Sequence, residues 1–397
     1  ISKTARLFGG NMIGQMIVVL SAPILTRFYS PEEFGLLGSF MAVIAILSVF
    51  STLRFESAIV LESSVIGEQA VMALCISLIA VSMTLASLCF YLLYWLNFLP
   101  SGILVLGNLI WLLPVGLVAV SVYKVLTWSA VKAQSLEDIG IARVYQNTTM
   151  ASLQTVFGGV GLGPSGLILG QLIGLLSGIV RLSHNVNFKF IYRIIISRKS
   201  YMKFMAVKYA RFFKYSLPGD VMNVFAQQLP VILLASIFSP TIAGFYVLAD
   251  KVFRSPLLVF SDAVSKSVMS VAVKCRENGT LGLFTLLFLK LLIRLSSVAF
   301  IIFALISPKL FEILFGLNWV EAGVYAQLMT PAFFTIFIFV PVLAMLVILE
   351  RQELEFLYQA SLLIGVLRGR GHQADTGADR HRHSNALRFG AMLSQVG

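Results

Sequence analysis

The sequence predicts an all-α polytopic membrane protein built from two pseudo-symmetric helical lobes, of which the second is truncated. First, 58% of the 397 residues are hydrophobic and only 12% are charged, roughly half the charged share of soluble domains. Second, uncharged runs such as residues 69–123 are long enough for two helical crossings of about 20 residues each. Third, a motif near the N-terminus returns after the midpoint of the chain. This composition excludes an ordinary soluble fold.

A basic segment at residues 189–214 divides the chain near its middle. It carries eight Lys or Arg residues and no acid. Since Lys and Arg accumulate in the cytoplasmic loops of membrane proteins, we expect this linker and the N-terminus to lie in the cytoplasm. The expected organisation is an N-terminal six-helix lobe over residues 1–188, the linker, and an incomplete C-terminal lobe over residues 215–367.

The repeated motif supports two lobes of parallel topology. Residues 23–37 read PILTRFYSPEEFGLL, and residues 232–246, which lie 209 positions later, read ILLASIFSPTIAGFY. In the same register, Gly10 and Asn11 align with Gly219 and Asp220. An internal repeat of this length is typical of transporters built from two related halves.

Ten membrane spans are expected from the apolar runs and the breaks between them. The break at residues 97–102 contains proline and glycine, and the turn at residues 158–166 is rich in glycine, as loop segments are. A loop is also expected at residues 308–321. The expected spans are residues 7–26, 36–61, two within 69–123, two within 144–180, then 217–238, 242–272, 281–306 and 322–349.

The last 30 residues, 368–397, do not continue the membrane pattern. The apolar run at residues 356–367 is too short to cross a bilayer, and three of the four histidines follow it. We interpret residues 368–397 as a disordered or out-of-frame tail. Neither these histidines nor the three cysteines have a spacing typical of metal ligands, so no metal and no other cofactor is expected.

Charge and motifs argue against a nucleic-acid-binding protein and against an enzyme. Residues 181–214 contribute nine positive charges and no negative one to the net charge of +12. Such a concentration is typical of a cytoplasmic segment between membrane helices. No nucleophile–base set and no phosphate-binding loop is evident. We therefore expect no nucleic-acid partner and no catalytic site.

Charged residues inside the expected spans are the main candidates for a functional site, since a charge at membrane depth is costly without a partner or a cavity. The span at residues 242–272 carries five of them within one half of the helix circumference: Asp250, Lys251, Arg254, Asp262 and Lys266. They form ion pairs four residues apart on a buried face, or they line a wet cavity that receives an anionic headgroup. The second interpretation explains so many charges better.

The next span carries Lys290 and Arg294, one helical turn apart, and no acid. Paired cations suit a diphosphate. The alternatives are a partner on another span, such as Asp250 or Asp262, and snorkelling of the long side chains to the interface.

The first two spans also carry polar candidates. Within the second span Arg54 and Glu56 point about 200° apart, so we expect Arg54 to face the cavity and Glu56 to pack in the bundle or accept a proton. Asn11 and Gln15 lie one turn apart and would contact sugar hydroxyls or hydrogen-bond another helix.

Two stretches carry a resemblance to a known family. Residues 23–35, PILTRFYSPEEFG, followed by residues 54–60, RFESAIV, resemble the start of the bacterial polysaccharide flippases. These are the O-antigen and capsule translocases of the multidrug/oligosaccharidyl-lipid/polysaccharide exporter superfamily. Residues 227–230, QQLP, and the Ser-Pro motif that ends at Gly244 resemble that family's second lobe. The similarity extends over residues 7–366.

The resemblance implies two helical lobes around a central cavity and an alternating-access cycle. It implies a lipid-linked oligosaccharide on undecaprenyl diphosphate as substrate, carried across the bacterial inner membrane as a repeat unit of lipopolysaccharide or capsule. By this analogy Arg54, Arg254, Lys290 and Arg294 would hold the diphosphate, and Asp250 or Asp262 would couple transport to H⁺ or Na⁺. Membrane lipids, a polysaccharide polymerase and a chain-length regulator are the expected partners.

Two other functions compete with this one. An ion-coupled drug or cation antiporter of the same superfamily would carry cationic substrates, which fits poorly with an excess of cations inside the membrane. A membrane polysaccharide polymerase or ligase would be expected to have a large polar outer loop, whereas the outer loops expected here are short.

Overall fold

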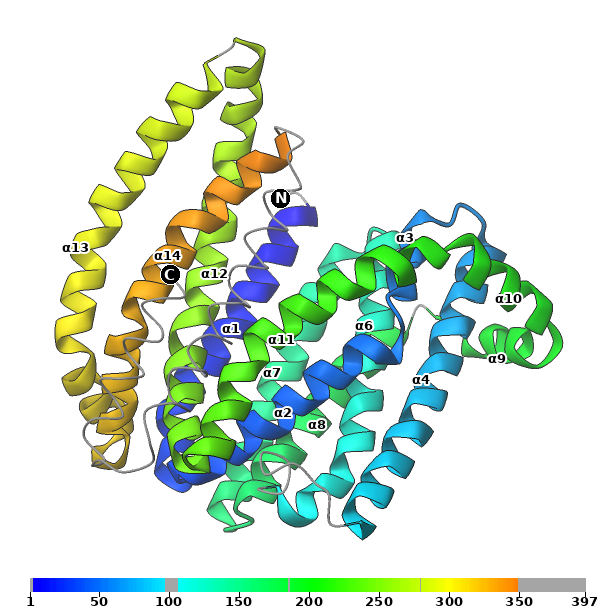
Figure 1. Cartoon of the computed structure of the whole chain (residues 1–397), viewed down its shortest axis with the longest axis horizontal. Helices are drawn as coiled ribbons and strands as arrows, with labels where there is room; N and C mark the ends of the chain where they lie inside the picture. The colour runs from blue at the N-terminus through cyan, green and yellow to red at the C-terminus, as the bar shows by residue number, and fades with distance from the viewer. Residues whose placement is uncertain (1–2, 97–105, 185, 279, 349–397) are drawn as a thin grey trace. The chain divides into compact units, whose positions relative to one another are not determined.

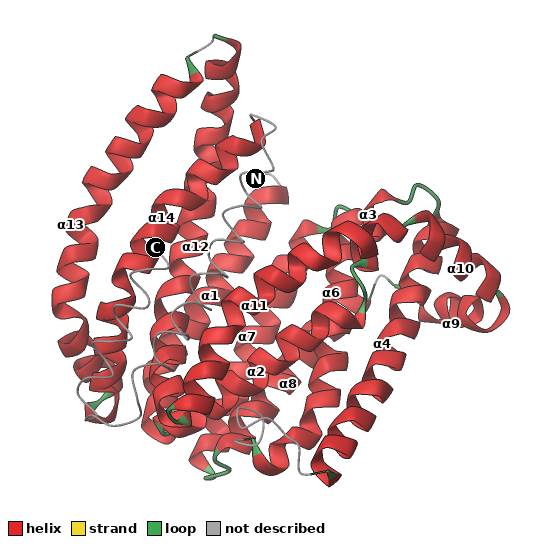
Figure 2. Cartoon of the chain, viewed as in Figure 1, coloured by secondary structure: helices red, strands yellow, loops and turns green. Residues whose placement is uncertain are grey.

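The computed structural model describes residues 3–96, 106–184, 186–278 and 280–348, and every regular element in these ranges is a helix (Figure 2). The chain divides into two compact units, Ile1–Gly244 and Phe245–Gly397. The dividing point lies inside a long helix. The lobe boundary expected in the linker stays a prediction.

The first unit contains ten α-helices and the start of an eleventh, α12, in the part that the structure describes (Figure 1). Their bounds are α1 Lys3–Phe28, α2 Pro31–Ser51, α3 Ala58–Leu61, α4 Val65–Trp95, α6 Leu113–Lys132, α7 Leu136–Gly159, α8 Pro164–Ser183, α9 Phe188–Ser197, α10 Lys199–Lys208 and α11 Leu217–Ile237, with α12 beginning at Pro240. The short helices η1 Phe55–Ser57, η2 Gly107–Leu112 and η3 Phe212–Ser216 connect them.

The second unit holds the rest of α12, which ends at Glu277, together with α13 (Leu281–Phe315), η4 (Leu317–Trp319) and α14 (Val320–Ile348). Its core is aromatic: the ring of Phe253 packs against those of Phe303, Phe311 and Phe333. Helices α13 and α14 approach closely at Gly323, whose carbonyl accepts a hydrogen bond of 2.9 Å from Ser307.

These helices confirm an all-α polytopic membrane protein. Eight segments of the described part are long and apolar enough to cross a bilayer. Helices α7 and α12 are also longer than 20 residues but carry more charge. Together the ten correspond to the ten crossings expected from the sequence.

The repeated Ser-Pro-x-x-x-Gly motif starts a helix in both copies and brings the two copies together. Ser30 caps α2 with a reciprocal capping box to Glu33. A Cβ on Gly35 would overlap the carbonyl oxygen of Pro240, and a Cβ on Gly244 would overlap the carbonyl oxygen of Pro31. The first turns of α2 and α12 thus cross in direct backbone contact, which only glycine at both positions permits.

Several boundaries differ from those expected. The span expected at residues 36–61 is wrong in its second half, because α2 ends at Ser51. The loop expected at residues 308–321 is largely helix, since α13 continues through Pro308 to Phe315. The expected break at residues 97–102, the short run at 356–367 and the tail at 368–397 lie outside the described residues.

Candidate functional site

The charged site of the first unit lies where the backbone leaves the helical conformation after α2. After Ser51 the chain leaves the helix, and Leu53 and Arg54 adopt φ values of 49° and 67°. Two consecutive non-glycine residues in the left-handed region are costly and occur where the surrounding structure holds them. The break turns the Arg54 and Glu56 side chains toward α6 and α11.

Four side chains from three parts of the first unit form an ion cluster, which we define as Arg54, Glu56, Lys124 and Asp220. The guanidinium of Arg54 lies 2.7 Å from Asp220 Oδ2 of α11 and 3.8 Å from Glu56 Oε1. Lys124 Nζ of α6 lies 2.5 Å from the same Glu56 oxygen. Two cations and two acids therefore balance within one site.

Burial differs sharply within the ion cluster. The Glu56 side chain has no exposed surface, whereas Arg54, Lys124 and Asp220 are each about a quarter exposed. Among described residues, Glu56 Oε2 is buried without a hydrogen-bond partner. A carboxylate buried in this way depends on its neighbouring cations, since an unpaired charge in such a place is strongly unfavourable.

The ion cluster corrects one sequence expectation and adds two residues. Arg54 and Glu56 were expected to point about 200° apart, and this is wrong because the helix breaks before them and both join one cluster. Lys124 and Asp220 were not among the expected site residues. The alignment of Gly219-Asp220 with Gly10-Asn11 already indicated an acid inside a membrane helix, and this was the signal that could have identified Asp220.

In the second unit, Asp250 and Arg254 of α12 form an ion pair of 2.6 Å, four residues apart. Each side chain is between a quarter and a third exposed. Asp262 and Lys266 lie in α12, but their side chains are outside the described ones, so the second expected pair stays a prediction. The first pair has the geometry expected of two charges that neutralise each other within one helix, and the Arg254 side chain keeps some exposed surface.

Lys290 and Arg294 of α13 differ from all of these charges. Both are exposed within the second unit, and neither has an ion-pair partner among the side chains that the structure describes. Leu292 and Ser296 are buried on α13 and lie roughly 200° around the helix from the two cations, at 100° per residue. The cations thus lie on the side of α13 opposite the buried Leu292 and Ser296.

Asn11 and Gln15 are half-buried on α1, beside the surface that packs on α7. That packing surface is made by Gly10 and Gly14, and Asn147 of α7 donates a 2.9 Å hydrogen bond to the Gly14 carbonyl. Neither Asn11 nor Gln15 makes a side-chain hydrogen bond to another residue whose side chain is described. Their expected contact with sugar stays a prediction.

The chemistry offered by these charges is anion binding. Guanidinium and ammonium groups bind phosphate through charge-assisted hydrogen bonds, and arginine does so in a bidentate manner. Within the described ranges no three His, Cys, Asp or Glu residues are grouped to hold a metal ion.

Comparison with known proteins identifies relatives of the chain. The model of a family described as polysaccharide biosynthesis protein matches residues 24–324. No curated protein sequence shows significant similarity to the chain.

Two solved structures share the fold. One is described as the inward-facing conformation of a multidrug resistance MATE family transporter of the MOP superfamily; it has 12% sequence identity and a TM-score of 0.64, with 100% of this chain and 95% of that chain covered. The other, the Vibrio cholerae MATE transporter VcmN in a mutant form, has 12% identity and a TM-score of 0.51, with 99% and 92% covered. At this identity the likeness shows the fold alone.

Proposed function

Because this chain belongs to the polysaccharide biosynthesis protein family, we propose that it is a flippase for undecaprenyl diphosphate-linked oligosaccharide in the bacterial inner membrane. The family and the transporter fold support transport rather than catalysis. The cargo is an O-antigen or capsule repeat unit, and it crosses by alternating access. The excess of cations over acids on the membrane helices supports an anionic cargo over a cationic drug.

The observation that carries the proposal is the pair Lys290 and Arg294. Two cations on a membrane-spanning helix, without an acid beside them among described residues, need a counter-charge from elsewhere. A diphosphate supplies two negative phosphates at a spacing that two side chains one helical turn apart can follow. Arg294 is the stronger candidate of the two, since its planar guanidinium binds a phosphate by two hydrogen bonds.

Arg54 of the first unit and Arg254 of the second would each bind phosphate by exchanging one partner for another. Each guanidinium is held by a carboxylate, Asp220 at 2.7 Å and Asp250 at 2.6 Å, and each arginine side chain is partly exposed. An arriving phosphate competes with the carboxylate for the same donors. The free protein thereby keeps its cations compensated until the cargo replaces the acid.

This exchange gives the acids a role in coupling. When a phosphate binds Arg254, Asp250 loses its cation partner, and H⁺ or Na⁺ would take the place of that cation. Asp262 is the second candidate, at a position on the same helix. Asn11 and Gln15 are proposed to contact sugar hydroxyls. A polysaccharide polymerase and a chain-length regulator would receive the translocated unit.

Complementation of a flippase-null strain with the full chain tests the proposal, with surface polysaccharide as the readout at matched membrane levels. We expect the parent chain to restore polysaccharide and Arg254→Ala and Arg294→Ala to lose it. Lys309→Gln is the matched control, because Lys309 is also on α13 but is exposed and paired with Glu312 at 3.0 Å. This control should restore polysaccharide fully.

The outcomes separate the parts of the proposal. Full rescue by Arg254→Ala and Arg294→Ala would remove the phosphate site while retaining the transporter. If the parent chain makes the strain resistant to cationic drugs but restores no surface polysaccharide, even in strains with a matching glycan, the antiporter would be supported instead.

A further inference from the structure

The linker between α8 and α11 forms two short helices that the proposed transport function does not use. Helices α9 and α10 pack against α4, as Figure 1 shows beside one end of that helix. The buried residues of these helices are Ile191 and Ile194 of α9 and Met202 and Met205 of α10. The remaining faces of both helices are open.

The open surface of α9 is divided into an apolar and a basic stripe. Phe188, Tyr192 and Ile196 follow each other every four residues and are 44%, 66% and 56% exposed. At 100° per residue they cover one stripe of the helix, and Lys189 and Arg193 form the next. A short helix with an open apolar stripe beside a cationic one has the pattern of a helix that lies in a membrane interface.

Helix α10 also has open apolar and basic residues. Phe204 and Val207 are 57% and 69% exposed, and Lys199 and Lys203 are exposed beside them. Across residues 189–214 there are eight Lys or Arg and no acid. The surface therefore fits a partner that is apolar and anionic at once, which describes the headgroup boundary of an anionic bilayer.

The chain itself keeps these helices at membrane level. Helix α8, a candidate membrane span, ends at Ser183, and α9 begins five residues later at Phe188. Five residues reach at most about 18 Å even when fully extended. On the other side α10 ends at Lys208, four residues before the candidate span that begins at Phe212.

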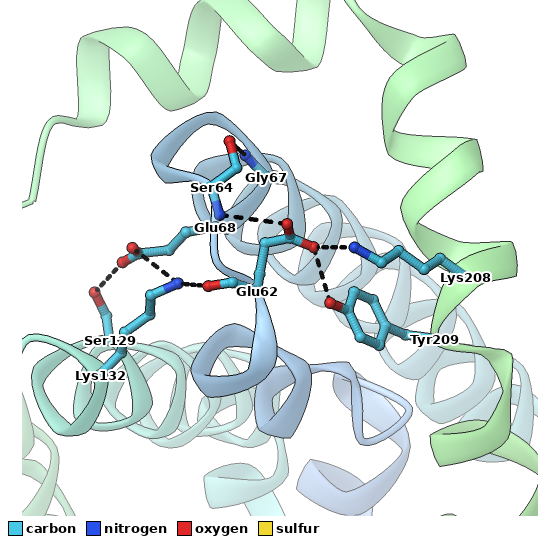
Figure 3. A network of polar contacts seen from close by, with 8 residues as sticks. All are labelled: Glu62, Ser64, Gly67, Glu68, Ser129, Lys132, Lys208 and Tyr209. Atoms are coloured by element: carbon cyan, nitrogen blue, oxygen red, sulfur yellow. Dashed lines mark hydrogen bonds and ion pairs between the residues drawn. The ribbon is translucent and has the colours of Figure 1, made fainter.

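A polar clamp around Glu62 holds the end of α10 against the turn between α3 and α4 (Figure 3). The buried carboxylate of Glu62 accepts hydrogen bonds from Lys208 Nζ at 2.6 Å and from the Tyr209 hydroxyl at 2.8 Å. Lys132 of α6 donates to the Glu62 backbone carbonyl and pairs with Glu68 at 3.5 Å. The hydrogen bond from Lys208 is the main reason that the pKa of Glu62 lies below its ordinary value.

We propose that α9 and α10 form a lipid-binding hairpin, clamped to the N-terminal unit through Glu62, that lies in the nearer leaflet. Phe188, Tyr192 and Ile196 enter the acyl boundary, and Lys189, Arg193, Lys199 and Lys203 bind the phosphates of anionic phospholipids. A bilayer is favoured over an acidic protein because the chain on both sides of the hairpin enters candidate membrane spans within a few residues. The hairpin would fix the first unit at a defined depth in the bilayer.

Hydrogen exchange of the full chain in nanodiscs tests this proposal. The discs contain either phosphatidylcholine alone or equal parts of phosphatidylcholine and phosphatidylglycerol. Peptides within residues 188–208 should exchange several-fold more slowly with phosphatidylglycerol, and high salt should reduce the difference. Peptides within α7 serve as the internal reference for intact folding.

Lys189→Gln with Arg193→Gln should abolish the dependence on phosphatidylglycerol while α7 keeps its protection. Lys309→Gln, a charge change far along the sequence on α13, should retain the dependence. Equal exchange in the two kinds of disc for the parent chain would overturn the proposal. Protection that rises with protein concentration and not with phosphatidylglycerol would also overturn it, in favour of a second copy of the chain as the occupant.

Discussion

The ion cluster of the first unit and the two cations on α13 of the second are both sets of charges among apolar helices, but they differ in how far each charge is neutralised by a neighbour. Arg54 and Lys124 each lie within 2.7 Å of an acid, and Glu56 between them is fully buried. Lys290 and Arg294 are exposed within their unit and have no such acid among described residues. Charges that neutralise each other stabilise a fold, whereas exposed charges without an ion-pair partner are suited to binding a ligand.

Removal of a compensating cation should have the largest effect on stability. Lys124→Met leaves the buried Glu56 with only Arg54 at 3.8 Å. We expect a loss of about 3 kcal/mol in the free energy of unfolding, as for other broken buried pairs. Denaturant unfolding of the purified chain measures this loss.

The matched variant is Glu56→Gln combined with Lys124→Met, which removes the buried charge together with its partner. It should recover much of the lost stability, and the double-mutant cycle gives the coupling between the two side chains. Additive losses would show that Glu56 does not depend on Lys124.

The two arginine–aspartate pairs should differ by a smaller amount. Asp220→Asn weakens a contact between α11 and the segment after α2, so we expect a loss of about 1 kcal/mol. Asp250→Asn weakens a pair within one helix and should cost about 0.5 kcal/mol or less. Thermal unfolding of both variants in the same detergent compares them, and a larger loss for Asp250→Asn would reverse the ranking.

The Glu62 clamp should make a small, pH-dependent contribution. The pKa of Glu62 is lowered from 4.5, so the folded state binds a proton more weakly than the unfolded state does. The stabilisation is complete above about pH 4.5 and declines as the pH falls through the lowered pKa. The thermal midpoints of the parent chain and Glu62→Gln should therefore differ at neutral pH and converge in acid. A constant difference would mean that ionisation of Glu62 is not involved.

The smallest effect on stability is expected for the open cations. Arg294→Gln removes a charge that stabilises no described contact, so the free energy of unfolding should change by less than about 0.5 kcal/mol. The same denaturant titration used for Lys124→Met measures it. A loss as large as that of Lys124→Met would show that Arg294 is compensated after all.

Much of the helical organisation could be predicted from the sequence. Apolar runs and the Ser30-Pro31 signal give most of the helices, and the repeat that ends in Gly35 and Gly244 indicates two related halves without revealing that its two copies touch. These features depend on local patterns, which a single sequence contains.

The ion cluster could not be predicted in the same way. No glycine or proline marks the break at Leu53 and Arg54, so the sequence reads as one continuous helix there. The pairing of Arg54 with Asp220 joins residues far apart in the chain, and only tertiary packing brings them together. At Pro308 the error is the reverse: the sequence predicts a loop, but α13 stays helical beyond this proline, where Phe311 and Phe315 are buried.

Binding of undecaprenyl diphosphate to the purified full chain tests the central claim most directly. The affinity of the parent is compared with that of the double variant Lys290→Gln/Arg294→Gln at equal folded fraction, with Lys309→Gln as the control. Two lost charge-assisted hydrogen bonds should weaken binding at least about tenfold, while the control binds as the parent does. Equal affinity of the parent and the double variant would contradict a diphosphate site on α13.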